Sequence, residues 1–204
     1  QIKGEIGIGT NIRQGSPNQN EPRMLMVTAT GSGSGKTFIV TGIAGALKKR
    51  GYKVGVIKVG GDIRDAVSSL YLIKEPIKDY SSIKIGESGW TPLEQAVEEA
   101  AKKYNFLLVE GAMSAFTGLL NDNYKRPMST AEVAAALGAS TVLVVGCDKE
   151  GIEGALINTL NYVNILKHLG VKTTGVILNK LRVSYITDEI KQTIDDFLSL
   201  VEKG

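Results

Sequence analysis

The chain has 204 residues, of which 43% are hydrophobic and 22% are charged, the composition of an ordinary globular protein of one domain. Its net charge of +3 is too small, and its Lys/Arg runs are too short, to indicate a nucleic-acid partner. The single cysteine, Cys147, excludes an internal disulfide, and no apolar run is long enough to predict a membrane span. We therefore expect a cytoplasmic protein without nucleic-acid or membrane partners.

Residues 1–23 differ in composition from the rest of the chain. They are rich in Gly, Asn, Gln and Ser and show little apolar pattern, so we interpret them as a linker or an arm. The predicted domain covers residues 24–204. Because the chain begins with Gln1 rather than Met and its last predicted element is a helix, we expect a fragment of a longer protein or a stand-alone domain.

The first predicted strand, over 24–29, leads directly into a glycine-rich loop and then into an amphipathic helix over 36–50. The glycines of the loop can adopt backbone angles that other residues avoid, so that successive N–H groups can converge on one anion. The positive end of the following helix faces the same point. Together these features predict a phosphate-binding loop, whereas the alternative is a turn that merely joins a strand to a helix.

The start of the helix supplies the groups that a nucleoside triphosphate needs. Lys36 provides a charge for the outer phosphates, and the hydroxyl of Thr37 is a natural ligand for Mg²⁺. One departure from the usual P-loop spacing is Thr30, where a glycine is expected. The residues expected to bind the nucleotide here are Gly31, Ser32, Gly33, Ser34, Gly35, Lys36, Thr37 and Phe38.

The remainder of the chain alternates between short apolar runs and longer amphipathic stretches. We predict strands over 53–59, 106–109, 141–145 and 173–178, helices over 91–104, 129–137, 153–169 and 187–201, and an irregular region over 66–90. Unbroken apolar runs indicate strands buried on both faces, as in a parallel sheet. The alternation predicts a doubly wound, mostly parallel α/β fold.

In such a sheet, ligands bind at the carboxyl ends of the strands. Glu110 follows an apolar strand, as expected of a carboxylate that holds Mg²⁺, and Asp62 could supply a second contact to the metal. Lys58 would place a second cation on the transferred phosphoryl group, although a lysine at a strand end can also extend into solvent. Asp65 and Asp148 are weaker candidates.

Four further residues are weaker candidates for a functional role. Cys147 is interpreted as a structural thiol, and His168 as a cation near a helix C-terminus. Tyr71 and Trp90, in the irregular region, could line a substrate face or pack in the core.

These motifs resemble the synthetase domain of the cobyrinic acid a,c-diamide synthase and cobyric acid synthase family, with dethiobiotin synthetase as a more distant relative. The resemblance runs from about Met24 to Leu181 and is specific for the ATPase core. It rests on the segments GSGSGKT (31–37), RGYKVGVIKVGGD (50–62), VEGAM (109–113), STAEVA (129–134) and GVILNK (175–180).

The resemblance implies a dethiobiotin synthetase-like P-loop fold and a ligase of cobalamin biosynthesis. In that family ATP phosphorylates a substrate carboxylate, and ammonia or an amine then displaces phosphate to form an amide. The resemblance also implies a small-molecule carboxylate substrate, a glutaminase domain or subunit as a partner, and a homodimer. The resemblance implies that Lys36 and Lys58 bind the phosphates and that Asn179 contacts the adenine edge. It implies that Mg²⁺ is bound by Thr37, Asp62 and Glu110.

The chain also departs from the full diamide synthases. Gly61 stands where they have proline in Pro-Asp-Tyr, and the histidine that they carry after the second strand is absent. These departures concern the corrin substrate and leave the ATP site intact. Two alternatives stay open: a regulatory nucleotide-binding module of a larger protein, and an ATPase switch that acts through a partner. The related partition ATPases carry a lysine where this chain has Gly31, which argues against a switch of that type.

Overall fold

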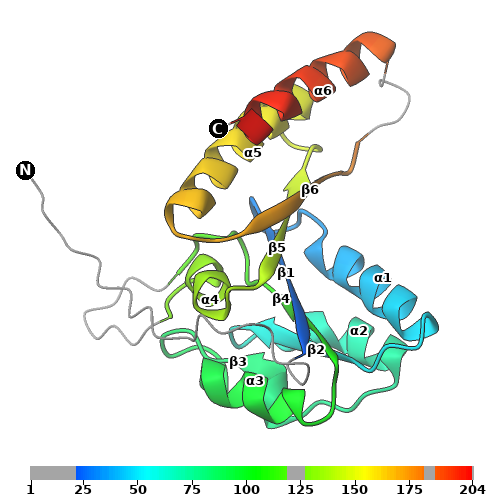
Figure 1. Cartoon of the computed structure of the whole chain (residues 1–204), viewed down its shortest axis with the longest axis vertical. Helices are drawn as coiled ribbons and strands as arrows, with labels where there is room; N and C mark the ends of the chain where they lie inside the picture. The colour runs from blue at the N-terminus through cyan, green and yellow to red at the C-terminus, as the bar shows by residue number, and fades with distance from the viewer. Residues whose placement is uncertain (1–21, 119–126, 182–186, 204) are drawn as a thin grey trace, which may run out of the picture.

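The computed structural model describes residues 22–118, 127–181 and 187–203, and the predicted linker over 1–23 lies almost wholly outside them. Within the described residues a six-stranded sheet has the order β3-β2-β4-β1-β5-β6, with all neighbouring strands parallel (Figure 1). The strands are β1 (Arg23–Ala29), β2 (Val54–Val59), β3 (Ser82–Ile83), β4 (Phe106–Glu110), β5 (Ser140–Gly146) and β6 (Thr173–Asn179). The helices are α1 (Lys36–Lys49), α2 (Arg64–Ile73), the short 3₁₀ helix η1 (Asp79–Ser81), α3 (Leu93–Ala101), α4 (Thr130–Leu137), α5 (Gly151–His168) and α6 (Asp188–Lys203).

Two hydrophobic clusters cover the two faces of the sheet and make a three-layer domain (Figure 1). On one face α1 and α2 pack through side chains such as Val40 and Leu70. On the other face α3, α4 and α5 pack through side chains such as Ala96 and Leu166. The strands are apolar on both sides because both faces are covered. The predicted doubly wound, mostly parallel α/β fold is therefore confirmed.

The strand order fixes where a ligand can bind. Strands β1 and β4 are neighbours in the sheet. The connection after β1 leads to β2, toward the β3 edge, whereas the connection after β4 leads to β5, toward the β6 edge. A crevice opens at the carboxyl ends of two strands with this arrangement. The glycine-rich loop follows β1, and Glu110 ends β4, so both lie at this switch point.

The prediction of an irregular region over 66–90 is wrong. It contains most of α2, all of η1, and β3, which pairs with β2 at the edge of the sheet. Helix α2 has only ten residues. Strand β3 has two, which are too few for the alternating pattern of a strand to be recognised. Tyr71 and Trp90 are 85% and 47% exposed, so neither packs in the core. No helix among the described residues is long and apolar enough to span a membrane.

Truncating a side chain in the centre of the sheet should test this packing. Leu107 in β4 is fully buried, so the Leu107→Ala variant should lose about 3 kcal/mol of unfolding free energy through lost burial and a residual cavity. Ile157 on α5 is 58% exposed, and Ile157→Ala should cost less than about 0.5 kcal/mol. Urea denaturation followed by circular dichroism measures both. Equal losses in the two variants would contradict the layer arrangement.

Candidate functional site

The loop between β1 and α1 is shaped to receive an anion. Gly33 and Gly35 have φ angles of 76° and 95°, in the left-handed region that glycine adopts without strain. The Ser34 hydroxyl donates a hydrogen bond to the Gly31 carbonyl at 2.9 Å and closes the loop on itself. Helix α1 begins directly after Gly35 with no side-chain cap and no acidic residue in its first turn. Its N–H groups and its positive end are therefore left for a bound anion.

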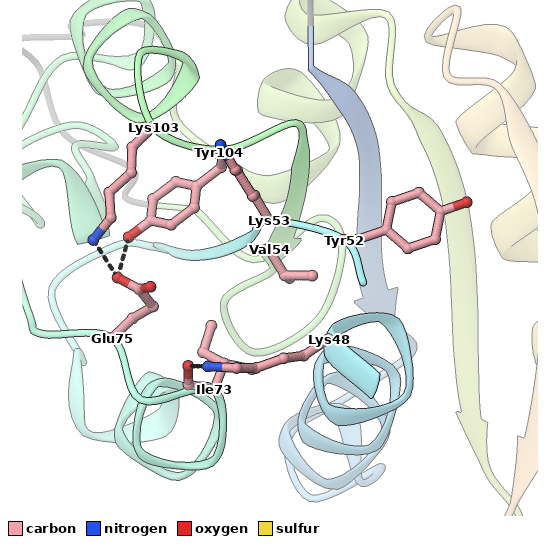
Figure 2. Close-up of a pocket in the computed structure, with 8 residues that line it drawn as sticks. All are labelled: Lys48, Tyr52, Lys53, Val54, Ile73, Glu75, Lys103 and Tyr104. Atoms are coloured by element: carbon pink, nitrogen blue, oxygen red, sulfur yellow. Dashed lines mark hydrogen bonds and ion pairs between the residues drawn. The ribbon is translucent and has the colours of Figure 1, made fainter. Parts of the chain in front are cut away.

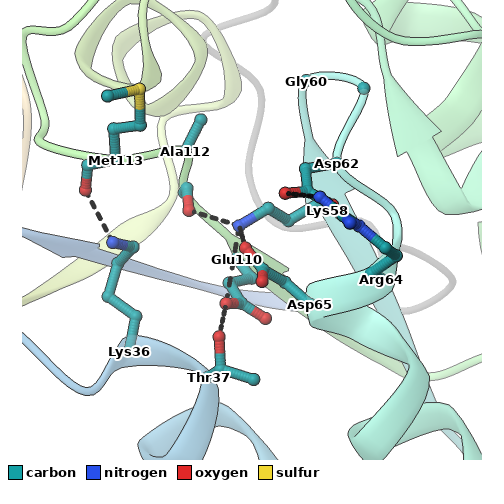
Figure 3. Close-up of polar contacts among 12 residues, drawn as sticks. Lys36, Thr37, Lys58, Gly60, Asp62, Arg64, Asp65, Glu110, Ala112 and Met113 are labelled. Carbon is teal, nitrogen blue, oxygen red and sulfur yellow. Dashed lines mark hydrogen bonds and ion pairs between the residues drawn. The ribbon is translucent and has the colours of Figure 1, made fainter. Parts of the chain in front are cut away.

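Lys36 extends from the start of α1 to the loop after β4. The side chain is buried, and its Nζ donates a hydrogen bond to the Met113 carbonyl at 2.6 Å (Figure 3). Met113, in the loop after β4, has a φ of 43°, which is unusual for a residue other than glycine. Burial, together with the charge of Lys58, lowers the pKa of Lys36 to about 8, although Glu110 and Asp65 act in the opposite direction. Phosphate oxygens would restore a counter-charge to this lysine.

Thr37, Lys58 and Glu110 meet at the carboxyl ends of the strands. The Thr37 hydroxyl donates to Glu110 Oε1 at 2.6 Å, and Lys58 Nζ lies 3.5 Å from the same oxygen (Figure 3). Glu110 and Lys58 are both buried. Lys58 also donates to the Gly111 carbonyl at 2.9 Å and pairs with Asp65 Oδ2 at 2.7 Å. Because Lys58 is buried and fully paired, the alternative of a lysine extended into solvent does not hold.

The donor groups at this point suit a hard divalent cation. Glu110 Oε2 is buried and has no hydrogen-bond partner, although a buried polar atom ordinarily has one. The Thr37 hydroxyl lies beside the same carboxylate, and oxygen atoms of these two kinds are ligands that Mg²⁺ prefers. The described residues contain no group of three or more His, Cys, Asp or Glu side chains that could hold a metal. A Mg²⁺ ion here would thus take its remaining ligands from phosphate and water.

The two aspartates after β2 lie differently. Asp62 is on the surface, where its carboxylate oxygens accept hydrogen bonds from Arg64 at 2.9 and 3.1 Å. These bonds hold the pKa of Asp62 below its usual value. Asp65, in the first turn of α2, instead reaches Lys58. Sequence reasoning favoured Asp62 from its position after the second strand and from the family resemblance, and its role at the metal stays a prediction.

Asn179 joins the last strand to the phosphate loop. Its Nδ2 donates to the Ser34 carbonyl at 2.8 Å, and a Cβ added to Gly35 would lie only 2.2 Å from that nitrogen. A side chain at position 35 would therefore collide with Asn179 as well as strain the backbone. The predicted contact between Asn179 and adenine stays a prediction. Phe38 is 79% exposed in the first turn of α1, and its nucleotide contact is likewise a prediction.

Other polar residues near the strand ends are outside this cluster. Cys147 is buried, and burial together with Asp148 raises the pKa of its thiol, which opposes formation of a nucleophilic thiolate. Asp148 forms an exposed ion pair with Lys180 at 2.9 Å. Neither residue contacts Lys36, Lys58 or Glu110 in the part of the chain that the structure describes.

A phosphate loop at the switch point of a parallel sheet, with a buried lysine and a carboxylate facing it, defines a P-loop nucleotide-binding domain. The chain belongs to the family described as the CobQ/CobB/MinD/ParA nucleotide binding domain, whose sequence profile matches residues 25–201.

Curated relatives give this family membership more detail. A hydrogenobyrinate a,c-diamide synthase from Mycobacterium tuberculosis is 32% identical over 173 residues, which cover 84% of this chain and 36% of the relative. A cobyrinate a,c-diamide synthase from Dehalococcoides mccartyi is 33% identical over 162 residues, which cover 79% of this chain and 33% of the relative. The chain thus spans about a third of the length of these relatives.

Two solved structures share the fold at low sequence identity. One is the septum site-determining protein MinD from Pyrococcus horikoshii in complex with Mg-ADP, with a TM-score of 0.51, 19% identity, and coverage of 85% of this chain and 77% of that one. The other is FtsY from Mycoplasma mycoides, with a TM-score of 0.53, 17% identity, and coverage of 89% and 58%. At these identities the likeness concerns the fold alone.

The lowered pKa of Lys36 predicts a pH dependence for nucleotide binding. Below about pH 8 Lys36 is charged in the free protein, and above it the charge is lost, whereas bound phosphate favours the charged form. Affinity for ADP should therefore fall above about pH 8, and binding at higher pH should take up a proton. Calorimetry in two buffers of different ionisation enthalpy measures this uptake. Its absence at about pH 8.5 would contradict the burial of Lys36.

The lowered pKa of Lys36 also makes the free energy of unfolding depend on pH. Between about pH 8 and the ordinary lysine value of 10.5, the unfolded chain retains a proton on Lys36 that the folded protein has lost. The contribution of this group to the free energy of unfolding therefore rises with pH across that window. A Lys36→Arg variant keeps its charge throughout and should lose both pH effects.

Proposed function

We propose that this chain is the ATP- and Mg²⁺-dependent synthetase domain of an amidoligase that activates a corrin carboxylate as an acyl phosphate. The observation that supports it most is the second buried lysine: Lys58 Nζ lies 3.5 Å from Glu110 Oε1, and its charge adds to burial in lowering the pKa of Lys36. Binding a nucleotide needs only the loop and Lys36. A second cation at the same point suits the transfer of a phosphoryl group to an acceptor. The relatives are a hydrogenobyrinate and a cobyrinate a,c-diamide synthase, and these names indicate the substrate class.

The proposed reaction has two steps. An oxygen of the substrate carboxylate attacks the γ-phosphorus of ATP, the bond to the β–γ bridging oxygen breaks, and ADP leaves. The product is a mixed anhydride of the carboxylic acid and phosphate. The lone pair of ammonia then attacks the carbonyl carbon, phosphate leaves, and the nitrogen loses a proton to give the amide. A glutaminase domain or subunit supplies the ammonia in this proposal.

Different residues of this chain bind the phosphates, stabilise the transferred group and hold the metal in this proposal. The loop over 31–35 and the N-terminus of α1 bind the phosphates, and Lys36 moves from the Met113 carbonyl to the phosphate oxygens. Lys58 stabilises negative charge on the transferred group, and Asp65 holds Lys58 in place. Thr37 and Glu110 would hold Mg²⁺, which would supply positive charge to offset that of the phosphates.

Three less central roles complete the proposal. Asn179, at the end of β6, contacts the adenine, and Phe38 contacts the nucleotide from the first turn of α1. Asp62 would add a carboxylate to the metal site if it released Arg64 when the nucleotide binds. A homodimer of the domain is part of the same proposal.

The test measures ADP release with Mg-ATP and ammonium, with and without cobyrinic acid. Ammonium replaces the glutaminase partner, so the chain can be assayed alone. The proposal predicts ADP release that depends on the corrinoid. ATP binding without any stimulation would overturn the substrate assignment and favour a regulatory module. A change of self-association between ATP and ADP without turnover would favour a switch.

A further inference from the structure

A cavity of about 350 Å³ lies at the end of the domain opposite the phosphate loop (Figure 2). Its volume falls at the lower end of the range found for small-molecule sites. The walls come from the last turn of α1, the start of β2, the end of α2 and the segment after α3. Helix α1 begins with Lys36 and reaches the cavity at Lys48, a rise of about 18 Å along its axis. The cavity is therefore separate from the nucleotide site.

One side of the cavity is a fixed polar arrangement around Glu75. Tyr104 is buried, its hydroxyl donates to Glu75 Oε2 at 2.8 Å, and Lys103 pairs with the same oxygen (Figure 2). Burial alone would raise the pKa of Glu75, but these hydrogen bonds outweigh it and lower the pKa. A Cβ at Gly55 would lie 2.4 Å from the Tyr104 ring, so the glycine leaves the space that the ring occupies.

The cavity carries more positive than negative charge. Three lysines line it, namely Lys48, Lys53 and Lys103, against the single carboxylate of Glu75. Lys103 neutralises Glu75, and Lys48 donates to the Ile73 carbonyl at the C-terminal end of α2. Burial and the hydrogen bonds to Tyr80 and Glu75 raise the pKa of Tyr104, so this phenol stays neutral. Lys53 has no side-chain partner among the described residues.

We propose that this cavity binds a small organic anion, a phosphate ester or a carboxylate with an apolar body. The acidic group of the ligand pairs with Lys53, and with Lys48, whose Nζ otherwise donates to the Ile73 carbonyl. Its apolar body packs on Val54, Ile73 and the ring of Tyr104, which make the buried wall. Lysines at an exposed rim with an apolar wall behind them suit a ligand that has both parts. This site is independent of the proposed amidoligase reaction.

Phenyl phosphate is a suitable probe because it carries a dianion on an aromatic ring. The titration uses the chain saturated with Mg-ADP, so that the phosphate loop is already filled. Chemical shifts of the Val54 and Ile73 methyl groups report on binding. We expect shifts at these residues with a dissociation constant of about 1 mM or lower. Phenylacetate replaces the phosphate by a carboxylate, and its binding compared with that of phenyl phosphate identifies which anion the site prefers.

Variants test the charges and the wall separately. A Lys48→Gln, Lys53→Gln double variant should bind phenyl phosphate about tenfold more weakly or worse, while Lys49→Gln, next to the cavity in sequence but outside its lining, should bind within about twofold of the parent. Inorganic phosphate and phenol, which each lack one part, should bind about tenfold more weakly than phenyl phosphate. Absence of shifts at Val54 and Ile73, or equal loss in Lys49→Gln, would overturn the proposal.

Discussion

The Lys36→Ala variant is expected to lose ADP formation by about 100- to 1,000-fold, the effect of removing one group that stabilises developing charge. Lys36 is a buried cation at the start of α1, directly after the phosphate loop, and its Nζ donates to the Met113 carbonyl. The carbonyl that it leaves belongs to Met113, which is 56% exposed and can be hydrated. The fold should therefore survive the change, and circular dichroism should show an unaltered spectrum.

A matched control lies at the other end of the same helix. Lys49 is exposed in the last turn of α1, and Lys49→Ala should form ADP at the parental rate within about twofold. Steady-state ADP formation with saturating Mg-ATP and substrate compares the variants. If Lys36→Ala kept its rate within about tenfold of the parent, Lys36 would not act on the transferred phosphoryl group.

The Glu110→Gln variant should raise the Mg²⁺ concentration for half-maximal ADP formation by about tenfold or more, and should lower the rate at saturating Mg²⁺ by about 100-fold. The glutamine keeps an acceptor for the Thr37 hydroxyl but loses the charge that a divalent cation requires. Lys58 retains Asp65 and the Gly111 carbonyl as partners, so its own charge is not left alone in the interior. Magnesium titrations of ADP formation give both quantities.

Asp148 provides the control for Glu110. It also follows a strand of the sheet, but it is exposed and pairs with Lys180. Asp148→Asn should therefore leave the Mg²⁺ requirement within about twofold of the parent. An unchanged Mg²⁺ requirement in Glu110→Gln would place the metal elsewhere in the site.

The main features of the fold could be predicted because they have strong local signals. The apolar runs of β4 and β5 and the Gly-Lys-Thr start of α1 are each read from consecutive residues. The meeting of Lys58 with Glu110 followed from topology, since neighbouring parallel strands end at the same edge. By contrast, β3 has two residues, and only its pairing with β2 makes it a strand.

The remaining features depend on long-range packing. Asp65 reaches Lys58 only because α2 begins at Arg64, an element that was not predicted. The contact of Lys36 with Met113 depends on a left-handed backbone at Met113. Such a conformation is usually predicted from a glycine, and this position has none. The cavity around Tyr104 combines segments that are far apart in sequence, and one of its lysines, Lys48, is also explained as a charge in the last turn of α1.

The measurement that tests the central claim most directly uses cobyrinic acid labelled with ¹⁸O in its carboxylates, incubated with the chain, Mg-ATP and ammonium. If the carboxylate attacks the γ-phosphorus, one of its oxygens stays in the amide and the other leaves with phosphate. We therefore predict one ¹⁸O atom in each inorganic phosphate released, measured by mass spectrometry. Amide formation with unlabelled phosphate would contradict an acyl phosphate and with it the proposed role of the two buried lysines.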